Sequence, residues 1–157
     1  MQESLTKIYK EYKLSRDSIQ LADVFVSHCS ADAIVDLNDT SFYEDTLVNS
    51  LKLKHSYEWI SDNVARGRLL SEIEVLTDKT KQAIAKFSIE VVGIFKMTVG
   101  ETIGQKELNR RLELQIVPQL LPYARSALAS LSSLLTLPPV LLPTMDVLLS
   151  MKKNGQA

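Results

Sequence analysis

The stretch from residue 104 to residue 151 most constrains the fold, because little of it can face water. Between Leu114 and Met151 the only formal charges are Arg125 and Asp146, although about a quarter of the residues in an average soluble chain are charged. Most of its side chains must therefore be buried. Either the rest of this chain covers them, or other molecules do.

Apolar residues recur here at steps of three and four, which predicts a long amphipathic helix over residues 108–135. The main stripe is Leu108, Leu112, Ile116, Leu120, Ala124, Leu128, Leu131 and Leu135. Further apolar residues widen this stripe, so we expect the helix to be buried on more than one side, in its own domain and against another subunit. Pro118 and Pro122 each remove a backbone donor, which predicts a kink or a restart near Pro118.

The uncharged run over residues 126–145 approaches the length that spans a bilayer, roughly 20 residues. Pro138, Pro139 and Pro143 interrupt any continuous helix there, and six Ser and Thr residues lower its hydrophobicity. We therefore expect no membrane insertion.

Composition narrows the possibilities further. A chain of 157 residues fits a single domain over residues 1–157. The net charge of −1 provides no basic surface for a phosphate backbone, so we expect no nucleic-acid partner. One cysteine, Cys29, excludes an internal disulfide, and the start lacks the pattern of a signal peptide. These features favour the cytoplasm.

Four segments have the alternation of β-strands. They cover residues 17–29, 50–60, 68–78 and 83–99. The second alternates most cleanly, with apolar residues and His55 on one parity and lysines on the other. Gly93 predicts a bend or a bulge in the last strand.

Helices and a loop complete the expected architecture. Helical spacing of apolar residues predicts a short N-terminal helix over residues 1–14. Prolines predict an ordered apolar loop over residues 135–144, followed by a last helix over residues 144–153. The fold class is α+β: a four-stranded antiparallel sheet with the long helix, the Pro-Pro loop and the second helix packed on one face.

No catalytic cluster is evident. His28 and Cys29 are neighbours on a strand, so their side chains point to opposite faces. His55 lies on an apolar parity, which favours a structural role. Glu72 and Glu74 share a strand face that is normally solvated. We therefore expect no enzyme, no metal site and no cofactor.

Three short patterns resemble the SecB family of protein-export chaperones. They are GIFKM at positions 93–97, LPYARSALASLSSL at 121–134 and LPPVLLPTMDVL at 137–148. The resemblance implies a homotetramer, a dimer of dimers, whose long helices stack at the subunit interface. It also implies a holdase that needs no ATP and binds unfolded or precursor polypeptides in grooves between the sheet, the Pro-Pro loop and the last helix.

The resemblance places family positions at Gly93 to Phe95, at Pro122 to Arg125 and at Leu137 to Pro139. The residues expected to bind clients are Ile94, Leu137, Val140, Leu141, Met145, Leu148, Leu149 and Met151. Those expected at the subunit interface are Leu112, Ile116, Tyr123, Arg125 and Leu128.

The chain departs from the family in its charge. Family members that deliver clients to the SecA motor present carboxylates on the outer sheet face, whereas this chain is near neutral. Asp23 occupies one acidic position, but Ser27 and Ser88 occupy two others. This argues against docking to SecA. Two alternatives stay open: a dedicated antitoxin chaperone of a toxin-antitoxin-chaperone system, and a non-chaperone protein that holds an apolar small molecule between sheet and helix.

Overall fold

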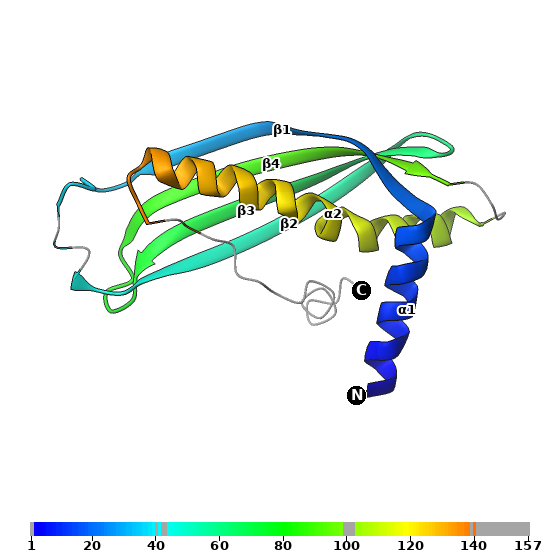
Figure 1. Cartoon of the computed structure of the whole chain (residues 1–157), viewed down its shortest axis with the longest axis horizontal. Coiled ribbons are helices and arrows are strands. Elements are labelled where there is room, and N and C mark those ends of the chain that lie inside the picture. Colours follow the sequence, from blue (N-terminus) through cyan, green and yellow to red (C-terminus); the bar gives the residue numbers. More distant parts are fainter. Residues whose placement is uncertain (1, 40, 42–43, 99–102, 139, 141–157) are drawn as a thin grey trace.

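The computed structural model describes residues 2–39, 41, 44–98, 103–138 and 140. Two helices and four strands lie in this part of the chain, arranged as Figure 1 shows. In chain order they are α1 (Gln2–Ser18), β1 (Ile19–Ala33), β2 (Leu47–Ser61), β3 (Val64–Thr77), β4 (Ala83–Met97) and α2 (Gln105–Leu134). The strands form one antiparallel sheet in the order β1-β4-β3-β2, which confirms the predicted fold class.

Helix α2 lies across one face of the sheet, which we call the inner face (Figure 1). It packs mainly over β1, β4 and β3, and only slightly over β2. The core forms where α2 meets β3 and β4, and its fully buried side chains include Leu69, Phe95, Ile116 and Leu120. The two edge strands, β1 and β2, are much less covered.

Two glycines let α2 approach the sheet closely. Gly67 and Gly93 are direct cross-strand partners on β3 and β4. A Cβ atom added at Gly93 would lie 2.7 Å from Leu120 Cδ2, and one added at Gly67 would lie 3.2 Å from Ile116 Cγ1. The predicted bend or bulge at Gly93 is therefore wrong, since its glycine serves close packing. The register shifts lie on β1 instead.

The predicted restart of the long helix is also wrong. α2 continues through Pro118 and Pro122 as one helix. Ile116, Leu120 and Ala124, on both sides of the prolines, are fully buried. Their packing outweighs the local preference of proline to break a helix. The predicted last helix over residues 144–153 lies outside the described residues.

Candidate functional site

The inner face of edge strand β2 carries a long apolar row that α2 leaves half covered. Its members share one face of the strand, and we call them the β2 row: Leu47, Leu51, Leu53, Tyr57 and Trp59. Each is partly exposed, whereas the inner-face residues of β3 are buried. At about 3.3 Å per residue the row is about 40 Å long. The site is thus an extended, mainly apolar strip, interrupted by Asn49 and His55, and the outer edge of β2 beside it pairs with no other strand of the described residues.

Polar contacts with α2 fix the aromatic end of the β2 row. Trp59 Nε1 donates to Asn109 Oδ1 at 2.7 Å, and Tyr57 Oη donates to Glu113 Oε1 at 3.3 Å. Burial is the main factor that raises the pKa of Tyr57 above its ordinary value, and the Glu113 carboxylate adds to it. The two rings are therefore oriented at their polar tips while part of their apolar surface is available for contact.

A groove of about 310 Å³ lies at the opposite end of the β2 row. Leu47 and Asn49 of β2, with Val75 of β3 and Asp45, line one side, and Leu137, Pro138 and Val140 line the other. Leu137 and Val140 thus border a groove with the sheet, and their binding of clients stays a prediction. Each of these two side chains is 6% exposed, so they form the wall more than the open surface.

The end of α2 holds this wall in place. The N–H groups of Thr136 and Leu137 donate to the carbonyls of Ser133 and Ser132, and Thr136 has a φ of 57°. These bonds form the Schellman arrangement that ends many helices. The buried Ser132 hydroxyl also accepts the Val140 N–H at 3.3 Å. The segment after the helix is therefore folded back toward β2.

The structure separates Ile94 from the other predicted client-binding residues. Ile94 pairs with Asp23 and Arg66 on the outer face of the sheet, opposite α2, because its parity is opposite to that of Phe95. Ile94 therefore lies on the other side of the sheet from Leu137, and its binding of clients stays a prediction. The remaining predicted residues lie outside the described part of the chain: Leu141, Met145, Leu148, Leu149 and Met151.

The predicted interface residues divide into two groups. Leu112, Ile116 and Leu128 have no exposed surface within the single chain, so the structure assigns them to the core of the subunit. Tyr123 is 42% exposed and Arg125 is partly exposed, so both can still meet a second copy. Arg125 Nε is buried and has no hydrogen-bond partner among the described residues.

Charges of both signs cover the outer face of the sheet and are paired. Arg66 bonds Glu58 at 2.7 Å, Arg68 bonds Glu90 at 3.3 Å, and Lys86 lies 3.6 Å from Glu74. Ser27 donates to the Glu90 carboxylate, and Lys52 lies opposite Glu72. This face is not the acidic surface that the resemblance associates with SecA.

The candidates for chemistry do not converge. His28 pairs with Glu90 on the outer face and Cys29 with Ile89 on the inner face, both on β1. No group of three or more His, Cys, Asp or Glu residues in the described part of the chain is arranged to hold a metal ion. No helix among the described residues is long and apolar enough to cross a membrane.

The sequence does not identify the β2 row as a candidate binding surface. The alternation of β2 predicts the strand and assigns its apolar parity to the core. The exposure depends on β2 being an edge strand and on the position of α2, and neither is encoded in the local pattern.

Comparison of the structure with solved structures identifies a SecB-like fold. The Rv1957 SecB-like chaperone of Mycobacterium tuberculosis, solved in complex with a ChAD peptide from the Rv1956 HigA1 antitoxin, superposes with a TM-score of 0.70 at 16% identity. The match covers 87% of this chain and 97% of that one. A protein of unknown function from Streptococcus agalactiae matches with a TM-score of 0.46 at 12% identity, over 80% of this chain and 96% of that one. No protein-family model and no curated protein matches the sequence.

Proposed function

We propose that this protein is an ATP-independent chaperone, a holdase that binds non-native polypeptides such as preproteins for export. The half-covered β2 row is the observation that supports the proposal. Apolar side chains of an unfolded segment would be buried against it, at roughly 25 cal/mol per Å² of apolar surface removed from water. The outer edge of β2 also offers backbone donors and acceptors to an extended chain.

The client class has two candidates. The SecB-like fold favours a general holdase, and the M. tuberculosis neighbour, which was solved with an antitoxin peptide, favours a dedicated antitoxin chaperone. An apolar small molecule is less well supported, because the site is an open strip about 40 Å long and small ligands favour enclosed pockets. Competition between an unfolded preprotein and an antitoxin peptide for the same groove distinguishes the first two.

Self-association is part of this proposal. Edge strand β1 is exposed on both faces, and Phe25 and Val26 on it are 52% and 42% exposed. Pairing of two β1 edges would cover these side chains and satisfy the free backbone groups. Tyr123 and Arg125 on α2 offer a second surface for a dimer of dimers. We place the assembly in the cytoplasm and assign it no enzymatic activity.

The test measures solution mass and suppression of client aggregation without ATP in one preparation. The variant Leu51→Gln/Leu53→Gln alters the inner face of β2, and Lys52→Gln/Lys54→Gln alters the outer face of the same strand. The loss of apolar contact should weaken client affinity about tenfold in the leucine variant only. Thermal unfolding checks that both variants fold. Equal affinity of both variants for the client contradicts the assignment.

A further inference from the structure

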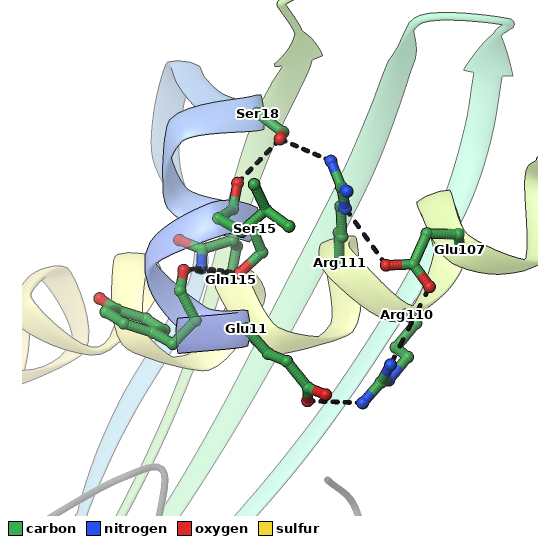
Figure 2. A network of polar contacts seen from close by, with 9 residues as sticks. Glu11, Ser15, Ser18, Glu107, Arg110, Arg111 and Gln115 are labelled. Atoms are coloured by element: carbon green, nitrogen blue, oxygen red, sulfur yellow. Dashed lines mark hydrogen bonds and ion pairs between the residues drawn. The ribbon is translucent and has the colours of Figure 1, made fainter. Parts of the chain in front are cut away.

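The C-terminal half of helix α1 is anchored to α2. Figure 2 shows the anchor: Gln115 donates to Ser15 at 2.7 Å, Arg111 donates to Ser18 at 2.8 Å, and Arg110 pairs with Glu11. Ser15 and Gln115 are fully buried. All these α1 residues lie between Glu11 and Ser18, and the N-terminal half projects away from the sheet (Figure 1). A helix of this length is marginal alone, so the network positions it.

The outward surface of α1 is basic. Lys7, Lys10, Lys13 and Arg16 follow at three-residue steps and all four are exposed. Arg16 has an acidic neighbour in Asp17, at 3.9 Å. Among the described residues, no carboxylate forms an ion pair with the three lysines. We call these four residues the α1 basic face.

The opposite end of the molecule is acidic. The connection between β1 and β2, residues 34–46, contains four acids and no Lys or Arg. The acids are Asp36, Asp39, Glu44 and Asp45, and we call them the acidic connection. The Ser41 N–H donates to Asp39 and holds the pKa of that carboxyl below its ordinary value, so it stays charged.

The two charged surfaces cannot neutralise each other within one chain. α1 precedes the first residue of β1 and the acidic connection follows its last, so a strand of 15 residues separates them. That is about 46 Å, several times the Debye length at physiological salt, which is about 8 Å. Both surfaces are therefore open to a partner of opposite charge from outside the chain.

We propose that the α1 basic face of one copy docks against the acidic connection of a second copy. When two β1 edges lie antiparallel, the start of each strand lies beside the end of the other. This arrangement places each α1 next to the partner's acidic connection. The contact forms twice around a two-fold axis, so the assembly closes. The inference uses the proposed self-association but does not depend on client binding.

Charge reversal in the full-length chain tests the contact. One variant, Lys7→Glu/Lys10→Glu/Lys13→Glu, makes α1 acidic, and a second, Asp36→Lys/Asp39→Lys/Glu44→Lys, makes the connection basic. Two copies of the same variant bring like charges together at both contacts. One copy of each variant brings opposite charges together at both contacts. Solution mass is measured at low salt and in 1 M salt, with the second variant carrying an affinity tag that identifies mixed dimers.

The wild type should associate, and 1 M salt should weaken its association about tenfold by screening exposed charges. Each variant alone should associate about tenfold more weakly at low salt, and the mixture should recover mixed dimers. A single chain carrying all six reversals should recover self-association, which also shows that the altered segments fold. Unchanged self-association of either variant overturns the proposal, as does a mixture that stays dissociated. Wild type that stays monomeric but binds anionic vesicles through α1 overturns it too.

Client affinity, measured on the same samples, separates this result from the proposed function. Loss of the charge contact should leave the affinity of the β2 row for an unfolded client within about twofold of the wild-type affinity, since each row lies within one chain. Dissociated variants that still bind the client therefore leave the chaperone proposal intact.

Discussion

At the residue scale, the two aromatic side chains of the β2 row combine an apolar surface with polar contacts to α2. Tyr57 and Trp59 each present a half-exposed ring and hold their polar atoms in hydrogen bonds with α2. Those bonds satisfy groups that would otherwise resist burial under a bound client. The apolar parity of β2 could be read from its alternation. The partners Asn109 and Glu113 could not, because they come from a helix about fifty residues later in the chain.

The ionisation of Tyr57 gives a prediction at high pH. Its pKa is raised in the folded state, so the folded protein holds the phenolic proton more tightly than the unfolded chain does. The stability that this adds is fully present below pH 10 and is lost as pH rises through the folded pKa.

Comparison with Tyr57→Phe isolates that contribution, because the other tyrosines are common to both proteins. The unfolding free energy of the wild type relative to the variant should be smaller at pH 11 than at pH 8. Denaturant titrations at both pH values measure it. A difference that stays constant or grows with pH shows that the pKa of Tyr57 is not raised.

At the scale of elements, local sequence patterns predict where the strands and helices lie better than how these elements pack together. Alternation and helical spacing located all four strands and the long helix, because both signals are local. The local structure at Pro118 and Gly93 depends on tertiary contacts. Packing against the sheet keeps α2 continuous through Pro118, and α2 approaches the sheet closely at Gly67 and Gly93. The alternation of β4 places Ile94 and Phe95 on opposite faces of the sheet. It does not show which of these faces α2 covers.

The close approach of α2 to Gly93 predicts that a larger residue at this position destabilises the fold. Gly93→Ala places a Cβ 2.7 Å from Leu120 Cδ2 and 2.8 Å from Leu21 Cδ1, so the buried Leu120 and the partly buried Leu21 must move. We expect a loss of about 1–3 kcal/mol in the free energy of unfolding, measured by denaturant titration.

Gly104→Ala provides the control for that substitution. Nothing lies within 4 Å of a Cβ at Gly104, which precedes the first residue of α2. This variant should lose no more than about 1 kcal/mol in its free energy of unfolding, the usual cost of an unfavourable residue at this helix position. If both variants lose the same stability, the close approach of α2 does not matter energetically.

At the scale of the whole molecule, α2 covers the inner face of the sheet unevenly. One long helix cannot cover four strands, and α2 lies over β1, β4 and β3. β2 retains an apolar inner face that is half open, and β1 retains an exposed edge. We propose that clients use the first and a second copy uses the other. The uncharged C-terminal stretch predicted surplus apolar surface on the C-terminal half of the chain. The half-open face of β2 is a different surface, and strand order was needed to locate it.

The most direct test of the client groove uses Trp59, because it is the only tryptophan in the chain and lies in the β2 row. An unfolded client that lacks tryptophan is titrated into the protein while Trp59 emission is recorded. If the client covers the β2 row, the half-exposed indole is dehydrated, and its emission should shift to shorter wavelength and saturate with client binding. Binding that saturates by an independent measurement while the Trp59 spectrum stays unchanged would contradict the account.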